Sequence, residues 1–360
     1  MKRLKKVLKI LGIGGLGLFI SVSGASTSNA GDIPISVDAS KPGTTRIIWD
    51  DFSNGFKNEA WFYFSAGNYI GNDGHVTTSN KGLEVVSKGT NPVTGEPAFT
   101  KTLAQESENG GLPGAIDHVK WLAYMNHTST KGIPGFDAAP KKVLSFESTL
   151  SGRTFGTQFH PFGDAITDPN DIRLASFAMN TMDMETFMVF DFFITNNQIY
   201  AFYERLPLGR GTLGNYAAFS YKIPVAERNP EDFHKLKISY DKDKGIVKWF
   251  VKNKEVFRVD KIGYRIDRKY LILDHGGKEQ LVKPDQLVAG LGLFTLLDAA
   301  ENGKGLVKLS NEENFYFDPI KGEPNPISFV DPISLESNRL FGQGAKLQVK
   351  NINVVYSDSK

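Results

Sequence analysis

The chain has 360 residues, of which 40% are apolar and 23% charged, and its formal net charge is +2. This length and composition suit a globular protein with one large β domain or two ordinary domains. The sequence has no Cys, which excludes thiol catalysis, Cys-ligated metals, disulfides and a lipid anchor on Cys. The 36 Gly and 12% aromatic residues favour a strand-and-turn protein over a helical one.

The first thirty residues form a segment of their own. The basic start "MKRLKKVLKI" is followed by an apolar run and by small residues that end at Ala30. This order predicts a secretory signal peptide cleaved after Ala30, because the apolar run is shorter than the roughly 20 residues of a membrane anchor. Removing its five basic residues leaves 37 basic and 40 acidic residues. We therefore expect a secreted, extracellular or periplasmic protein with no membrane span and no nucleic-acid partner.

After a polar lead-in over residues 31–45, short strand patterns alternate with turns up to residue 357, without a long amphipathic helix. The segment "HVKWLAYMNH" starts at His118. As a strand it places His118 and Tyr124 on one face, where both could line a pocket as ligand-binding residues. The other interpretation is an ordinary strand of a sandwich.

Further segments alternate clearly between apolar and polar residues. Their number and spacing favour antiparallel strands in a β-sandwich, and no break in composition over 261–345 marks a second domain. The clearest strand patterns cover residues 142–152, 235–240, 246–259 and 347–356.

The stretch "METFMVFDFFITNNQIYAFYERL", residues 184–206, predicts a hairpin with a tight turn at "TNNQ". This turn opposes Asp191 to Phe202 and Val189 to Glu204. One face of the hairpin is then almost wholly apolar, and we assign it to the core between two sheets. The other face mixes carboxylates with aromatic rings and carries Asp183, Glu185, Phe187, Val189, Asp191, Phe193, Tyr200, Phe202 and Glu204.

A sheet face of this mixed kind is typical of a saccharide groove, in which rings contact sugar CH groups and carboxylates bind hydroxyls. Asp191 and Glu204 are diagonal neighbours, about 7–8 Å apart at Cα, which permits either a retaining or an inverting pair of carboxyls. We predict both as acid/base residues, the more buried one having the raised pKa, and Glu185 as a third catalytic candidate. Tyr200, Phe202 and Asp183 are predicted ligand contacts. Solvated carboxylates on an exposed sheet are the alternative.

Several segments together resemble a known fold. The order "IIWDDFSNGF", "GLEVVS", "KVLSFESTLSG", "DFHKLKISYDKDKGIVKWFVKNKEVFRV" and "VKNINVVY" is similar to the concanavalin A-like jelly roll of laminarinase- and lichenase-type glycoside hydrolases. The resemblance covers residues 46–357 and implies an all-β, single-domain jelly-roll β-sandwich with a poly- or oligosaccharide partner. The Glu-x-Asp-x-x-Glu strand of those enzymes is absent, so their retaining mechanism is not implied. "DHVKWLAYMNHTS" and "RIDRKYLILDHGG" look like a secreted bacterial and fungal family of unassigned function.

Other motifs in the sequence bear on a lyase, a Ser hydrolase and a calcium site. "TQFHPFG" offers Gln158 and His160 in the Gln-x-His order of alginate-lyase-type jelly rolls, so His160 is a further ligand-binding candidate, with a turn residue as the alternative. No Gly-x-Ser-x-Gly elbow is present, which disfavours a Ser hydrolase. No cofactor is predicted. The resemblance to jelly rolls of this kind implies that a structural calcium is possible. The segment "DKDKG" is a weak match to a calcium loop, and a hairpin turn explains it better.

We therefore expect a secreted carbohydrate-active protein. The first hypothesis is a hydrolase that cleaves a polysaccharide in a sheet-face groove. A lectin-like binder without catalysis, a polysaccharide lyase and a structural surface protein are the alternatives. The sequence does not decide between these four hypotheses, and it does not identify the glycan.

Overall fold

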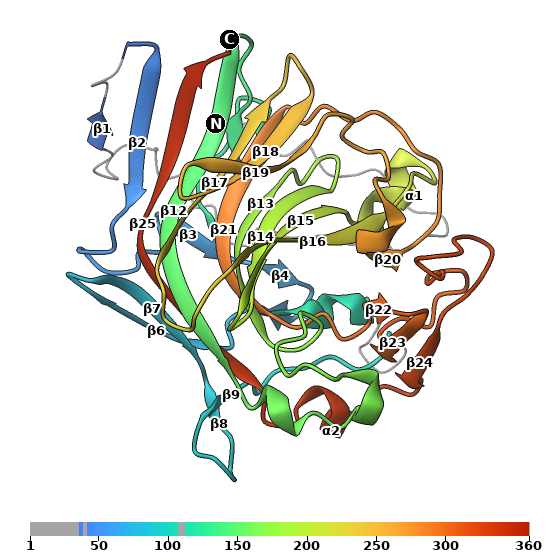
Figure 1. The fold of residues 1–360 in the computed structure, drawn as a ribbon. Coiled ribbons are helices and arrows are strands. Elements are labelled where there is room, and N and C mark those ends of the chain that lie inside the picture. The colour runs from blue at the N-terminus through green and yellow to red at the C-terminus, as the bar shows by residue number, and fades with distance from the viewer. Residues whose placement is uncertain (1–35, 39–41, 107–111, 360) are drawn as a thin grey trace, which may run out of the picture.

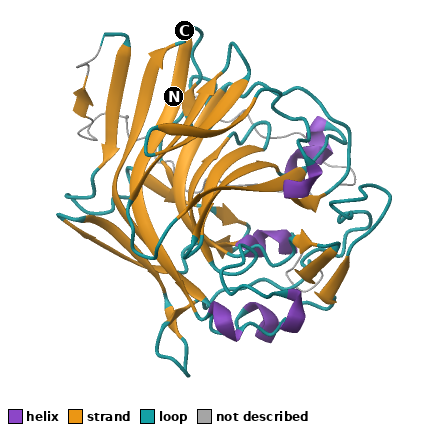
Figure 2. Cartoon of the chain, viewed as in Figure 1, coloured by secondary structure: helices purple, strands orange, loops and turns teal. Residues whose placement is uncertain are grey.

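The computed structural model describes residues 36–38, 42–106 and 112–359 (Figure 1). The predicted signal peptide, residues 1–30, lies outside them. Two large antiparallel sheets dominate the described part of the chain, and its helices are short (Figure 2). The predicted all-β class is confirmed: the described part of the chain is a β-sandwich of two large, mostly antiparallel sheets.

The first sheet, called sheet A, has the strand order β1-β2-β25-β12-β17-β18-β19. The long strand β25 pairs with β12 along its length on one side, as Figure 1 shows, and with β2 and then β7 on the other. The hairpin partner of β7 is β6. The strands of sheet A are β1 (Ser36–Asp38), β2 (Thr44–Asp50), β6 (Gly74–Ser79), β7 (Gly82–Ser87), β12 (Lys142–Phe155), β17 (His234–Asp241), β18 (Ile246–Val251), β19 (Lys254–Val259) and β25 (Gly344–Asp358).

The second sheet, called sheet B, has the order β20-β16-β15-β14-β13-β21-β10-β3, and β11 pairs with β21. The predicted hairpin is its centre. Its strands are β3 (Trp61–Tyr63), β10 (Val119–Met125), β11 (Phe136–Asp137), β13 (Ser176–Met182), β14 (Met188–Ile194), β15 (Gln198–Arg205), β16 (Phe219–Glu227), β20 (Leu271–Asp274) and β21 (Gln286–Phe294).

Smaller elements lie in the connections. Figure 1 shows a three-stranded sheet, β22-β23-β24, beside sheet B on the side away from β2 and β25. Among the described residues, no helix has the length and apolar character to cross a membrane. The small elements are β4 (Ser65–Ala66), β5 (Tyr69–Ile70), β8 (Gly89–Thr90), β9 (Pro97–Ala98), β22 (Ala300–Glu301), β23 (Lys304–Val307), β24 (Ser328–Asp331), η1 (Gly114–His118), η2 (Thr157–Phe159), η3 (Gly163–Ala165), η4 (Pro207–Gly209), η5 (Arg268–Tyr270), α1 (Arg210–Leu213) and α2 (Glu336–Arg339).

The main core lies between the two sheets. Phe190 of β14 packs edge-on against Trp249 of β18, with ring centroids 6.0 Å apart, and stacks at 6.3 Å with Tyr240 of β17. Trp249 Nε1 also donates a hydrogen bond of 2.8 Å to the backbone oxygen of Asp191, which ties sheet A to sheet B. The apolar face of the predicted hairpin is therefore core, as expected, and its opposite face points away from sheet A.

Two local predictions differ from the structure. The lead-in over residues 31–45 contributes β1 and the start of β2. The predicted strand at residues 183–187 is wrong, because these residues form the turn between β13 and β14. Asp183 caps this turn by accepting hydrogen bonds of 3.1 Å from the backbone nitrogens of Glu185 and Thr186, and Phe187 has φ +60°. The alternation of side chains between faces therefore begins only at Met188.

Candidate functional site

A cavity of about 110 Å³ lies on the face of sheet B that points away from sheet A. Its floor is formed by the central strands of this sheet. Its cover comes from Ile116 of η1, from residues 206–208 after β15, and from Leu296, Asp298 and Phe315 of the long connections after β21. Segments distant in sequence, some of them from residues 261–345, therefore roof the groove expected on this face and leave a cavity.

The hairpin register brings the two predicted carboxyls to this cavity. Asp191 is opposite Phe202 and Val189 is opposite Glu204, which confirms the predicted pairing. All four side chains line the cavity, so Asp191 and Glu204 are diagonal neighbours on its floor.

Asp191 is held by two hydrogen bonds from β13. Its Oδ2 accepts from Asn180 Nδ2 at 2.6 Å and its Oδ1 accepts from the backbone nitrogen of Thr181 at 2.6 Å. Only 2% of the residue is exposed. Burial raises the pKa of Asp191 well above its usual range, and the charge of Glu204 adds to this rise, whereas the two hydrogen bonds oppose it. Asp191 is thus a fixed carboxyl at which a negative charge is disfavoured.

Glu204 has a freer environment. Ser220 of the neighbouring strand β16 donates a hydrogen bond to Oε1, and the residue is only partly buried. Burial raises the pKa of Glu204 to about 7, against the opposing effects of the Ser220 hydrogen bond and the charge of His118. A carboxyl with this pKa is present in both protonation states near neutral pH, which suits a general acid or base.

His118, at the end of η1, also lines the cavity and is paired with a buried carboxylate. Its Nε2 lies 2.5 Å from Oδ1 of Asp298, and the hydroxyl of Tyr316 donates to Oδ2 of Asp298 at 2.7 Å. Burial alone would lower the pKa of His118, but the charges of Asp298 and Glu204 outweigh it and raise this pKa. Among the described residues, Asp298 is the hydrogen-bond partner of His118, through Nε2.

Two further ring side chains complete the lining. Tyr124 donates from its hydroxyl to Met182 Sδ at 3.2 Å. The Tyr124 ring packs directly over Gly290 of β21, and a larger residue there would clash with it, since a Cβ at Gly290 would lie 2.6 Å from that ring. His275 Nδ1 is bonded to Phe315 O at 2.6 Å, and burial lowers the pKa of His275 to about 4. His275 is therefore neutral at physiological pH. His118 and Tyr124 both line one pocket, but only Tyr124 lies in a strand, because His118 is the last residue of η1 and β10 begins at Val119.

Other predicted site residues lie away from the cavity. Glu185 is in the turn before β14 and pairs with Lys131, Nζ to Oε2 at 3.0 Å. Asp183 is fully buried in the same turn and accepts a 2.6 Å hydrogen bond from Gln286 Nε2. The turn at residues 183–187 removes both carboxyls from the alternation of β14, which is why they do not join Asp191.

Tyr200 and His160 are also not among the lining residues. Tyr200 lies on the cavity face of sheet B, opposite Phe193, and burial raises its pKa to about 12. His160 follows η2, where its Nδ1 accepts a 3.3 Å hydrogen bond from the backbone nitrogen of Phe162 and its ring stacks on Phe162. The Gln-x-His stretch therefore forms a 3-10 turn and not a strand.

Several residues of the site were not predicted. Asn180 is opposite Asp191 across β13 and β14, a pairing that could be derived only once the turn at 183–187 is known. Ser220 and Asp298 follow long connections that fix no register, so the sequence contains no signal that places them beside Glu204 and His118. Among the described residues, no group of three or more His, Cys, Asp or Glu side chains is placed to hold a metal ion.

The chain belongs to a family of unknown function, DUF6081, whose sequence model matches residues 49–358. A curated relative, "Uncharacterized protein L829" of Acanthamoeba polyphaga mimivirus, is 32% identical over 312 residues, which cover 70% of this chain. The chain spans 64% of the length of that relative.

Among solved structures, the chain is similar to a non-specific endo-β-1,3(4)-glucanase from family GH16, with 10% identity, a TM-score of 0.39, and coverage of 90% of this chain and 95% of that one. It is also similar to the κ-carrageenase of Pseudoalteromonas carrageenovora, with 12% identity, a TM-score of 0.36, and coverage of 92% and 100%. The alginate lyase A1-II′ gives 7% identity, a TM-score of 0.34, and coverage of 85% and 86%.

Proposed function

We propose that the protein is an exported acid–base enzyme that hydrolyses a glycosidic bond of a saccharide bound in the cavity of sheet B. One observation carries the proposal: Glu204, Asp191 and the Asp298-paired His118 converge on a single cavity. Aromatic side chains, among them Phe202 and Tyr124, share the lining and offer faces to a sugar ring.

The roles follow from the protonation states. Glu204, with a pKa of about 7, donates its proton to the glycosidic oxygen as the bond from that oxygen to the anomeric carbon breaks. His118 removes a proton from the water whose oxygen bonds to the anomeric carbon, and Asp298 stabilises the imidazolium that results. Asp191 is a positioning residue, because both its oxygens are already bonded to β13.

Two features narrow the substrate. The cavity, at about 110 Å³, is smaller than the roughly 300–1,000 Å³ of most ligand pockets, so it suits one terminal sugar unit better than an internal stretch of polymer. No Lys or Arg is among its lining residues. The carboxylate of a uronate would therefore have no cationic partner beside Asp191 and Glu204, which favours hydrolysis of a neutral sugar over elimination from a uronate.

The test compares the wild-type protein with Glu204→Gln on a panel of neutral and acidic oligosaccharides, with products identified by mass spectrometry. We expect products one water heavier per cleavage, and a loss of about 10²–10⁴-fold in turnover for the variant. Glu255→Gln is the matched control, because Glu255 is a hydrogen-bonded carboxyl on β19 of sheet A, away from the cavity. Unsaturated products would identify a lyase, and binding without any product would identify a lectin-like protein; either result contradicts the proposal.

A further inference from the structure

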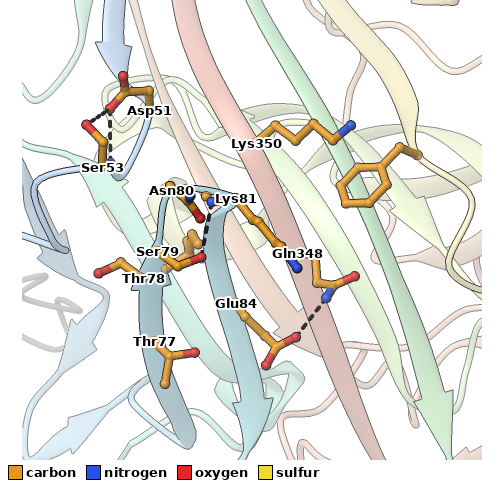
Figure 3. Close-up of a pocket in the computed structure, with 13 residues that line it drawn as sticks. Asp51, Ser53, Thr77, Thr78, Ser79, Asn80, Lys81, Glu84, Gln348 and Lys350 are labelled. Carbon is orange, nitrogen blue, oxygen red and sulfur yellow. Dashed lines mark hydrogen bonds between the residues drawn. The ribbon is translucent and has the colours of Figure 1, made fainter.

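A second concavity lies on sheet A, on the outer face turned away from sheet B, and has a volume of about 780 Å³ (Figure 3). The β6–β7 hairpin forms one side, Asp51 and Ser53 after β2 form another, and Gln348 and Lys350 project from β25. Its size falls within the roughly 300–1,000 Å³ of small-ligand pockets. None of its lining residues belongs to the cavity of sheet B.

The lining consists mostly of neutral hydrogen-bonding groups. Two carboxylates, Asp51 and Glu84, are balanced by the ammonium groups of Lys81 and Lys350, so the site has no net charge. Such a surface can bind many hydroxyl groups but gives no preference for an anionic ligand. The neutral polar side chains are Ser53, Thr77, Thr78, Ser79, Asn80 and Gln348.

One aromatic ring stands in this polar surface. Phe233, which precedes β17, is 38% exposed and lines the concavity. Lys350 Nζ lies 4.4 Å from the centroid of its ring, so one side of the ring is occupied by a cation. An exposed ring surrounded by hydroxyl and amide groups is the combination that recognises a sugar, because the ring packs against CH groups while polar side chains bind the hydroxyls.

The polar groups are held on rigid strands. Gln348 Nε2 donates to Glu84 Oε2 at 2.7 Å, which joins β25 to β7 across the floor of the concavity, as Figure 3 shows. Gly82, at the start of β7, has φ +113°, and a Cβ there would collide with the backbone oxygen of Val349. The hairpin therefore packs directly on β25, so a ligand would meet a preorganised surface.

We propose that this concavity is a second saccharide-binding site, specific for a neutral glycan chain, on the sheet opposite the cavity. It would hold a long glycan on the surface of the protein while the cavity takes a single sugar unit. The binding site stands on its own residues and does not depend on the acid–base chemistry of the cavity.

The experiment is affinity electrophoresis of the purified protein in native gels that contain laminarin, a neutral β-glucan, or other neutral glycans such as dextran and xylan, with alginate as the anionic comparison. We expect retarded migration in at least one neutral glycan, and at least a fivefold weaker retardation for Phe233→Ala and for Gln348→Ala. Phe250→Ala is the matched control. Phe250 lies in β18 with Lys237 Nζ 4.1 Å from its ring centroid, which is a similar cation–ring pair outside the concavity.

The outcomes separate the two proposals. Phe250→Ala, which lies outside both sites, should be retarded like the wild type. Equal retardation of wild type and Phe233→Ala, equal loss in Phe233→Ala and Phe250→Ala, retardation in alginate alone, or no retardation in any neutral glycan would each overturn the second site. None of these results would change the turnover expected of the cavity.

Discussion

The cavity of sheet B and the concavity of sheet A combine similar residue types in opposite environments. Both lie on outer sheet faces and contain at least one aromatic ring, and each has two carboxylates on sheet strands or directly beside them, to which the cover of the cavity adds Asp298. In the cavity, burial raises the pKa of Asp191 and of Glu204. In the concavity, hydrogen bonds from Ser53 lower the pKa of the exposed Asp51. On a sheet face, burial under covering segments thus favours the protonated form of a carboxyl, whereas hydrogen bonds at an exposed position favour the ionised form.

The cover also provides a partner that the sheet lacks. Asp298, in the connection after β21, pairs with His118 inside the cavity and is itself held by Tyr316. Sheet B therefore supplies Asp191 and Glu204 by register, whereas the roof supplies the imidazole–carboxylate pair. Substitution of Asp298 removes the carboxylate of this pair.

Asp298→Asn should give the largest effect among the following variants. The variant removes the charge that raises the pKa of His118, so the imidazole becomes a weaker base. We expect turnover to fall about a hundredfold. The acid limb of the pH–rate profile should move to lower pH, because His118 with a lowered pKa stays neutral down to a lower pH. The measurement is kcat against pH for the wild type and the variant.

The control for this prediction is Tyr316→Phe, which keeps Asp298 but removes its 2.7 Å hydrogen bond. Its acid limb should move much less than that of Asp298→Asn. A loss of turnover in Asp298→Asn with an unmoved acid limb would show that Asp298 supports only the fold, and that His118 is not the base.

The second prediction uses the raised pKa of Glu204 as a stability signal. The pKa rises from 4.5 to about 7 on folding, so the folded protein binds this proton more tightly than the unfolded chain. Stability from this group is therefore complete below pH 4.5 and is lost as the pH rises to 7. Glu204→Gln lacks this loss, so its free energy of unfolding relative to wild type should increase over that interval by at most roughly 3 kcal/mol.

Urea unfolding of both proteins at several pH values between 4 and 8 measures this difference. A constant difference between wild type and Glu204→Gln would mean that Glu204 titrates normally and that the cavity is open to water.

The sequence predicted the floor of the site better than its roof, for a physical reason. A two-residue turn at "TNNQ" allows one register, and this register alone sets Asp191 beside Phe202 and Glu204 beside Val189. Tyr124 followed from alternation in the same way, whereas His118 reaches the cavity from the end of η1, before the strand begins. The roof residues depend on contacts between segments more than a hundred residues apart, such as His118 with Asp298, and no local pattern encodes those contacts.

The same reasoning explains why the strand pattern wrongly placed Asp183 and Glu185 on the face of Asp191. Asp183 and Glu185 follow the parity of β14 in the sequence, but a turn capped by Asp183 interrupts the strand before Met188. Asp183 is the residue type that caps such turns, since a short carboxylate can accept hydrogen bonds from backbone nitrogens two and three residues ahead. A capping residue such as Asp183, a few residues before an apolar run, is therefore the signal that could have shifted the predicted start of the strand to Met188.

The smallest effect is expected for Glu185→Gln, which tests the boundary between the cavity and the turn beside it. The side chain of Glu185 is 38% exposed and that of its partner Lys131 is 44% exposed. An exposed pair of this kind contributes about 0–1 kcal/mol, and Lys131 keeps its second partner, Asp285, in the variant. Turnover should remain within about twofold of wild type, and the free energy of unfolding should change by less than about 1 kcal/mol. A loss of turnover comparable to that of Glu204→Gln, with stability unchanged, would mean that the substrate reaches beyond the cavity to this turn and that Glu185 belongs to the catalytic set.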